Sequence, residues 1–163
     1  MQLPKVTVHR AEQFEREQTV LNDEIVTSTH FDEQTDPTWK QIAEKFSASD
    51  NPLRPLYLDH HERRLAASPY DLRMNAQIRV FGNVMFVILP GDVLSTFGLR
   101  IKEAFKDFHV LLICYSNTYC NYLVPKEEYG QYFESLNTRL ALNEADKFID
   151  LVIQRGQDLI KNA

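Results

Sequence analysis

The chain has few of the residues that mark several common functional classes. Among its 163 residues there are only two cysteines, so the sequence contains neither a disulfide framework nor a Cys-x-x-Cys zinc signature. Its five glycines stand apart from one another, and neither a phosphate-binding loop nor a Gly-x-Ser-x-Gly motif occurs. A nucleotide site or a hydrolase nucleophile of these familiar kinds is therefore not expected.

Basic residues and long apolar stretches are also scarce. Lysine and arginine total 18 against 23 acidic residues, which gives a formal net charge of −5. Nucleic-acid-binding domains usually present a basic face, and membrane-surface patches need clustered cations. No stretch approaches the roughly 18 apolar residues of a membrane span, and Met1–Lys5 begin no apolar signal region. We expect no nucleic-acid partner, no membrane span and a cytoplasmic location.

The two cysteines occupy different contexts. Cys114 falls in an apolar run and is expected to be a small buried side chain, whereas Cys120 follows in a loop. A disulfide between them is the alternative, but free thiols in a reducing compartment fit these contexts better. A nucleophilic role for Cys120 would need a nearby base that the sequence does not indicate.

The apolar content is sufficient for one domain with a substantial core. Hydrophobic residues make up 44% and aromatic residues 11% of the chain, which is far from the composition of disordered proteins. The length is that of a single domain. Local patterns predict an α/β fold of the mixed α+β kind, with a central mixed β-sheet and flanking helices.

Patterns in the first 70 residues are less distinct than those that follow. Asp36-Pro37 favours a helix start, because aspartate caps helices and proline suits the first turn. The expected elements here are a strand over 5–9, a helix over 11–22, an extended segment over 25–31, a helix from 36, a loop over 47–55 and a short helix over 56–67.

The second half has clearer periodicity. Gly82-Asn83 separates two apolar runs and is typical of a hairpin turn. The expected elements are strands over 74–81 and 84–89, a helix after Asp92, a central strand over 109–115, a short helical turn over 125–129 and a closing amphipathic helix over 143–161.

Two of these strands end at polar side chains. The run 84–89 leads into Pro90-Gly91-Asp92, and the run 110–115 leads into Ser116-Asn117-Thr118-Tyr119. If the runs are neighbouring strands of a buried sheet, their ends lie where ligands bind in open α/β sheets. Asp92, Tyr119 and Tyr122 would then be oxygen donors on adjacent loops. The structural alternative is that Asp92 caps the next helix and Asn117 makes a turn.

The histidines do not complete such a site. None of the five forms a His-Glu-x-x-His pair. The densest group of metal-capable side chains is Asp59-His60-His61-Glu62. Four adjacent helical positions cannot face one point, because neighbours are about 100° apart. We therefore expect this group on a solvated face rather than around a metal.

Four short motifs occur in order over residues 75–138. They are Leu89-Pro90-Gly91-Asp92, Asn117-Thr118-Tyr119-Cys120-Asn121-Tyr122, Pro125-Lys126-Glu127-Glu128-Tyr129, and Gln131-Tyr132-Phe133-Glu134 with Thr138. This region resembles the end of the catalytic domain of the neutral/alkaline (non-lysosomal) ceramidase family, including its bacterial relatives. Residues 1–70 match only in general layout, and 143–161 form the closing helix.

The resemblance implies a reaction and a metal. The family hydrolyses the amide of ceramide to sphingosine and a fatty acid at a zinc ion, which polarises the amide and activates water. Its late zinc ligands fall on Asp92 and Tyr119, with Tyr122 as the fallback. Asn117, Glu134 and Thr138 are candidates for contacting the substrate or supporting the ligands. A lipid-like amide is the implied substrate.

The departures from the family pattern bear on activity. Aspartate is one methylene shorter than the family's glutamate, and Phe133 stands where the family has tyrosine. The family's histidine ligands lie upstream, outside this chain, and its later β-sandwich is also missing. The resemblance thus implies a C-terminal portion of a larger catalytic domain, with zinc in the parent enzyme. We expect no tight zinc binding by this chain alone, because two oxygen ligands make a poor zinc site.

Two functional hypotheses follow. The chain is either the C-terminal part of a zinc-dependent amide hydrolase, inactive in isolation, or a non-catalytic binding or scaffold domain that keeps the fold without the metal site. A portion of a domain exposes apolar surface where its upstream partner would pack. An upstream catalytic portion or a homodimer is the expected partner for that surface.

Overall fold

The computed structural model describes residues 17–28 and 71–161, except 117, 132, 133, 135 and 136, together with the single positions 50, 52, 55, 59 and 66. The elements in chain order are β1 (Glu17–Ser28), β2 (Asp71–Phe81), β3 (Val84–Ile88), β4 (Asp92–Val93), α3 (Ser95–Ala104), β5 (His109–Ile113), β6 (Tyr122–Leu123) and α5 (Glu144–Lys161).

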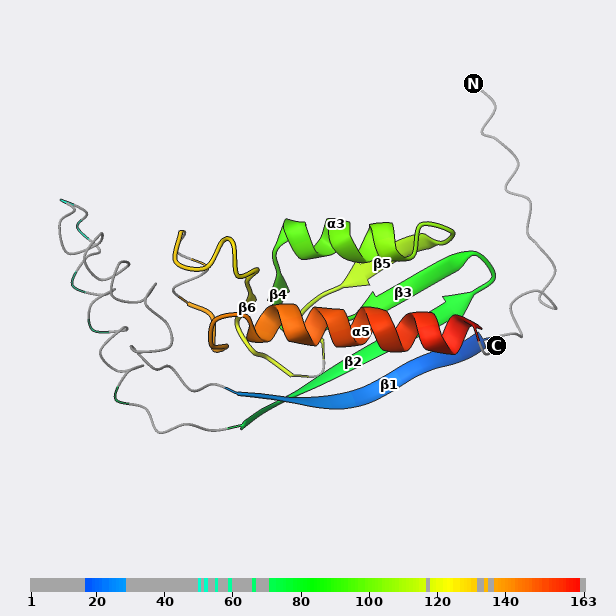
Figure 1. Cartoon of the computed structure of the whole chain (residues 1–163), viewed down its shortest axis with the longest axis horizontal. Helices are drawn as coiled ribbons and strands as arrows, with labels where there is room; N and C mark the ends of the chain where they lie inside the picture. Colours follow the sequence, from blue (N-terminus) through cyan, green and yellow to red (C-terminus); the bar gives the residue numbers. More distant parts are fainter. Residues whose placement is uncertain are drawn as a thin grey trace, which may run out of the picture.

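The main sheet has four strands in the order β1-β2-β3-β5 (Figure 1). The first three strands are antiparallel neighbours, and β5 pairs parallel to β3 after a crossover through α3. Gly82, at φ +61°, makes the tight turn between β2 and β3, as its Gly-Asn sequence predicts. The short strands β4 and β6 form a separate parallel pair. The predicted mixed sheet with flanking helices is therefore confirmed.

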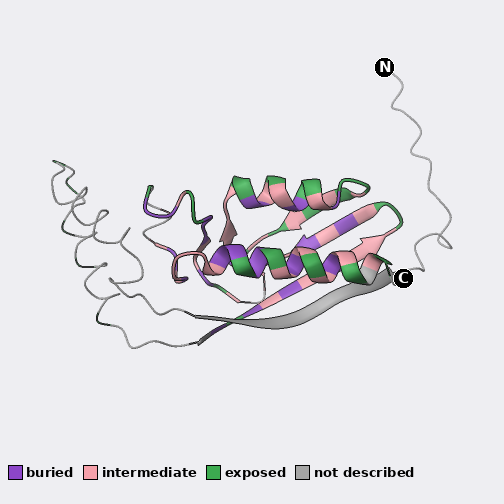
Figure 2. Ribbon diagram, viewed as in Figure 1, coloured by how far each residue is buried: buried purple, intermediate pink, exposed green. Residues whose placement is uncertain are grey.

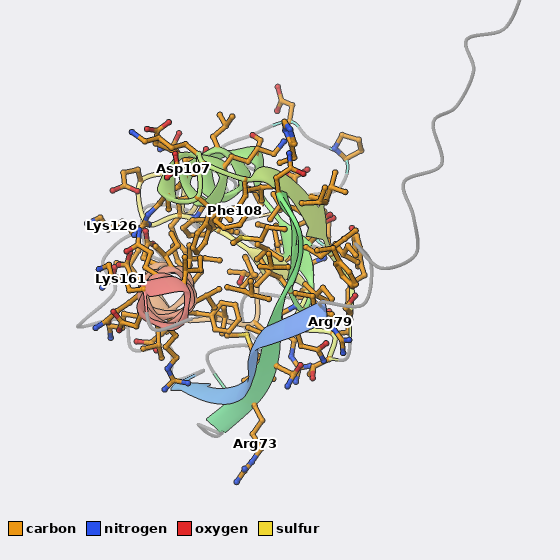
Figure 3. All side chains as sticks on the ribbon, turned by 90° about the vertical axis from the view of Figure 1, so that its right-hand side faces the viewer. Arg73, Arg79, Asp107, Phe108, Lys126 and Lys161 are labelled. Carbon is orange, nitrogen blue, oxygen red and sulfur yellow. The ribbon has the colours of Figure 1, made fainter. Side chains whose placement is uncertain are left out.

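One face of the sheet carries the core. Buried residues alternate with more exposed ones along β2 and β3, and α3 and α5 also carry buried residues (Figure 2). These buried residues belong to one core cluster. The fully buried side chains of these four elements include Met74, Ala76 and Ile78 of β2, Met85 and Val87 of β3, Phe97 and Ile101 of α3, and Phe148, Ile149 and Val152 of α5. Both helices lie on the same side of the sheet, whereas Arg79 of β2 points away from α5 (Figure 3).

The predicted helix over 11–22 is wrong for residues 17–22, which belong to strand β1. Residues 17–22 are extended and belong to a strand that pairs with β2 from Glu17 opposite Phe81 to Ser28 opposite Asp71, with one register shift between Thr19 and Leu21. The helical pattern had few apolar positions, and long-range pairing outweighs so weak a local preference. The predicted extended segment is confirmed over 25–28.

Several other N-terminal predictions lie outside the described residues. These are the strand over 5–9, the helix from 36 and most of the loop and short helix that follow. Within the short helix only Asp59 and Ala66 are described, and both are helical.

Two predictions in the second half need correction. β5 is an edge strand of the described sheet rather than a central one, because α3 carries the chain over to the outer side of β3. Residues 125–129 form turns, held by Glu128 N–H to Pro125 O (3.0 Å), instead of a helical turn. The strands at 74–81 and 84–89 and the closing helix are confirmed.

Both thiols are free and Cys120 lies in a loop, as predicted, but the burial of Cys114 differs from the prediction. Cys120 is fully buried, and Cys114 is only partly buried. Among the described helices, none combines the length and apolarity needed to cross a membrane.

Candidate functional site: a carboxylate beside three phenols

The loop after β3 brings Asp92 to the end of the sheet. Gly91 adopts φ +69° and lies so close to the neighbouring loop that an added Cβ would overlap Asn121 O and come within 2.6 Å of Cys120 Sγ. Asp92 N–H then donates to Asn121 O at 2.7 Å. This contact starts the β4–β6 pair, in which Asp92 and Tyr122 are directly opposed.

Tyr115 reaches the same place from the end of β5. Its N–H donates to Gly91 O at 2.9 Å, and its backbone turns into the left-handed region at φ 58°. Its hydroxyl donates a hydrogen bond to the Asp92 carboxylate. The ring of Tyr119 stacks on that of Tyr115 with 6.2 Å between centroids. Both rings are more than half exposed.

Tyr122 is held in place through its backbone. The Thr138 hydroxyl donates to Tyr122 O at 2.6 Å and accepts from Leu140 N–H at 3.2 Å. The Asn121 side-chain amide donates to Asn137 O at 2.9 Å. Segment 137–140 is therefore hydrogen-bonded to the start of β6. Together, Asp92, Tyr115, Tyr119 and Tyr122 form what we term the carboxylate–phenol cluster.

Electrostatics within the cluster favour neutral phenols. The hydrogen bond to Asp92 raises the pKa of Tyr115 to about 12, with smaller contributions from desolvation and the neighbouring charges. The pKa of Tyr122 is also raised, chiefly by desolvation and then by the charges of Asp92 and Glu134. A phenolate beside a carboxylate is disfavoured by like-charge repulsion. At neutral pH these tyrosines are therefore hydrogen-bond donors.

The structure brings together most of the residues singled out from the sequence. The two strand ends are side by side, because β3 and β5 are parallel neighbours. Asp92 does not cap the next helix, whose N-cap is Leu94. Glu134 is close enough to influence Tyr122, whereas the Thr138 hydroxyl bonds backbone groups. Asn117 lies outside the described residues.

Sequence reasoning missed Tyr115. It was interpreted as the last residue of an apolar strand, yet its side chain is 60% exposed and bonds Asp92. Its position immediately before the polar run 116–119 was the available signal. A strand's final side chain can leave the sheet surface when the backbone turns sharply there, as it does at Tyr115.

The side chains of the carboxylate–phenol cluster differ from the usual ligands of catalytic zinc. Its donors are one carboxylate and three phenols, whereas catalytic zinc usually has three protein ligands dominated by histidine nitrogen. No group of three or more His, Cys, Asp or Glu side chains able to hold a metal occurs among the described residues. His109 is at the opposite, amino-terminal end of β5. The described residues therefore do not fit a complete zinc site.

Two grooves occur elsewhere on the described surface. One, of about 490 Å³, runs between α3 and the edge of β5, and includes Leu99 and Val110 in its lining. The other, of about 380 Å³, lies between the start of α5, α3 and Lys126. Neither groove is lined by residues of the carboxylate–phenol cluster.

Comparison of the chain with known proteins gives no match to any family, to any curated protein or to any solved structure.

Proposed function

We propose that the chain is the C-terminal part of a zinc-dependent amide hydrolase of the neutral ceramidase type, and that it contributes the carboxylate and phenol side of the active site. The observation that supports this most strongly is the meeting of Asp92 with Tyr115 and Tyr122 at the carboxyl ends of two parallel strands. Ligand sites of α/β sheets lie at this position. A lipid-like amide is the proposed substrate.

The cluster has a definable chemical capacity of its own. Phenols that keep their protons at neutral pH can donate hydrogen bonds to a carbonyl oxygen or to a fatty-acid carboxylate. The Asp92 carboxylate can accept a proton or a cation. Because the described donors do not complete a zinc site, we assign no catalytic step to this chain in isolation. The upstream catalytic portion is the proposed source of the nitrogen ligands.

The free thiols agree with a reducing compartment, from which we infer a cytoplasmic location.

A second function, a non-catalytic binding or scaffold domain, is favoured by one specific contact. The Asp92 carboxylate is already engaged by the Tyr115 hydroxyl, and aspartate is shorter than the glutamate of the family motif. A site that has lost its metal would be free to form such a bond.

The chain alone and a longer protein provide separate tests. Zinc titrated calorimetrically into the 163-residue chain should bind with no sub-micromolar affinity, and a fluorescent N-acylsphingosine should remain uncleaved. A longer protein that includes an upstream His-x-His segment should hold about one zinc per chain and release fatty acid.

Substitutions in the longer protein identify the ligands. Asp92→Ala should remove the zinc and lower kcat/KM by about 100-fold or more. The matched control is Asp107→Ala, which removes an exposed carboxylate after α3. It should leave the zinc content and kcat/KM unchanged. A longer protein that binds no zinc and gains no stability from it would favour the scaffold function. Full zinc and full activity in Asp92→Ala would refute the proposed role of this residue.

A further inference from the structure

The outer edge of β5 is open in the described sheet. His109 N–H donates to Asn83 O, Ile113 O accepts from Leu89 N–H, and Tyr115 N–H donates to Gly91 O. These odd-numbered residues therefore direct their backbone groups toward β3. Because the N–H and C=O of one strand residue point to the same side, Val110 and Leu112 direct theirs outward. In the described part of the chain, no strand pairs with that side.

The strand is apolar on both faces. Val110 and Leu112 pack against the core cluster, whereas Leu111 and Ile113 on the opposite face are 50% and 40% exposed. Leu111 lies beside Phe86 and Ile113 beside Ile88 of β3. Parallel strand pairs are usually covered on both faces, so this surface has the composition of a buried one.

Natural edge strands are normally protected by lysine, proline, a bulge or an inward charge. Residues 110–113 read Val-Leu-Leu-Ile and contain none of these devices. The groove between α3 and β5 runs along this edge, and Leu99, which is 69% exposed, lies in its lining. Two lysines and a glutamate also line it, so both signs of charge are present: Lys102, Glu103 and Lys106.

We propose that the β5 edge is a homodimer interface, in which a second copy of the chain adds its own β5 antiparallel to the first. The argument for a second copy is the self-complementarity of the strand. Leu111 is the central residue of His109–Ile113. A two-fold axis that passes between the two copies of Leu111 opposes Val110 of each copy to Leu112 of the other. All outward backbone groups of these two residues are then paired, in four hydrogen bonds.

The same axis arranges the side chains. The two Leu111 side chains are directly opposed in a non-hydrogen-bonded pair on the exposed face, where each covers apolar surface of the other. An axis perpendicular to the sheet keeps both copies of α3 on one side, where Leu99 is exposed. Cys114 O, the next outward carbonyl, accepts a bond from Ser116 Oγ at 3.4 Å, which favours a register centred on Leu111. This interface uses only β5 and α3 and does not depend on the proposed hydrolase function.

Light scattering coupled to size exclusion is the first test. The chain should elute with about twice its mass of 19.0 kDa at micromolar concentration. Leu111→Lys places two cations opposite each other at the axis and should give the monomer. Gln154→Lys, on the exposed side of α5, is the matched control and should stay dimeric. A wild-type monomer at every concentration, or a dimeric Leu111→Lys, overturns the proposal.

Cross-linking tests the register without disturbing the fold. In a non-hydrogen-bonded pair the Cα atoms are about 4.5 Å apart, within disulfide range. Leu111→Cys, in a Cys114→Ser background, should therefore form a covalent dimer with oxidised glutathione. Ile113→Cys in the same background faces His109 of the other copy and should not. A dimer in which Leu111→Cys fails to cross-link, or in which both variants cross-link equally, overturns this interface.

Discussion

The phenol of Tyr115 donates a hydrogen bond to the carboxylate of Asp92, which ties the end of β5 to the start of β4. The contact raises the pKa of Tyr115 to about 12. We expect Asp92→Asn to move this pKa back toward the ordinary value of tyrosine, near 10. When tyrosinate formation is followed by absorbance, Asp92→Asn should show one fewer phenol of raised pKa than the wild type. Tyr115→Phe lacks the Tyr115 transition altogether and so identifies it in the wild-type titration.

Glu134→Gln is the matched control for that titration. Glu134 acts on Tyr122 and is not among the groups that shift Tyr115. The control should therefore lower the pKa of Tyr122 and leave the transition near pH 12 in place. An Asp92→Asn variant whose tyrosine titration matches the wild type would rule out the hydrogen bond as the cause.

The same shift predicts how stability depends on pH. Tyr115 has a higher pKa in the folded chain, about 12, than in the unfolded chain, about 10. Its contribution is therefore fully present below about pH 10 and is lost as pH rises through about 12. Denaturant midpoints of the wild type and Asp92→Asn should converge over this interval. Because Tyr115 is exposed, we expect a small difference.

The parts of the fold predicted from sequence are those with strong local patterns. Strands β2 and β3 join through Gly82-Asn83, and α5 has a regular apolar face. Each of these signals lies within one short stretch of chain. The candidate site at the ends of β3 and β5 was predicted for the same reason, because each apolar run and the polar residues that follow it are adjacent in the sequence.

The features that the sequence did not predict depend on contacts between residues that are far apart in the sequence. β1 is a strand because β2 pairs with it across more than 40 intervening residues, a partner that residues 17–22 do not reveal. Whether β5 is central or at an edge depends on which strand pairs with its other side. Cys120 is buried because Gly91 packs against it, and Tyr115 reaches Asp92 through a single left-handed residue. None of these is a periodic signal.

Gly91→Ala tests the close approach of the two loops. Gly91 and Gly82 have similar positive φ values, +69° and +61°, but a Cβ at Gly82 meets nothing within 4 Å. We expect Gly82→Ala to lower the free energy of unfolding by about 1 kcal/mol, the cost of the left-handed backbone alone. Gly91→Ala should lower it by about 3 kcal/mol, because the methyl group must also displace Asn121 and Cys120.

Urea denaturation of both variants measures this difference directly. An equal decrease in the free energy of unfolding for Gly82→Ala and Gly91→Ala would show that the two loops separate easily. Asp92 would then not be firmly held beside Tyr122. In the proposed longer hydrolase, Gly91→Ala should also reduce zinc content, whereas Gly82→Ala should not.

The two thiols should differ in reactivity. Burial raises the pKa of the Cys120 thiol to about 11, so little reactive thiolate forms at neutral pH. Cys114 is partly exposed. With a disulfide reagent at neutral pH, we expect Cys114 to react first and Cys114→Ser to lose the rapid phase. Both thiols should react quickly in denaturant. A rapid phase that persists in Cys114→Ser would place Cys120 at an accessible position.

Asp146 joins three segments of the chain, and its removal should destabilise the fold. Its Oδ1 lies 3.3 Å from Arg100 Nη1 of α3, and its Oδ2 accepts from Lys126 N–H at 2.8 Å. The side chain is only 10% exposed. Truncation leaves the Lys126 N–H and the Arg100 guanidinium without this partner, and it leaves Glu144 as the remaining carboxylate in the first turn of α5.

Asp150 is the matched comparison, because it also pairs with Arg100 but its side chain is 61% exposed. We expect Asp146→Ala to lower the free energy of unfolding by about 2 kcal/mol and Asp150→Ala by less than about 1 kcal/mol. Asp146→Asn keeps one acceptor for Lys126 N–H and should fall between them. If instead the two alanine variants were equally stable, Arg100 alone would account for the junction of α3 with α5. The hydrogen bond from Lys126 N–H to Asp146 would then contribute nothing measurable to the stability of this junction.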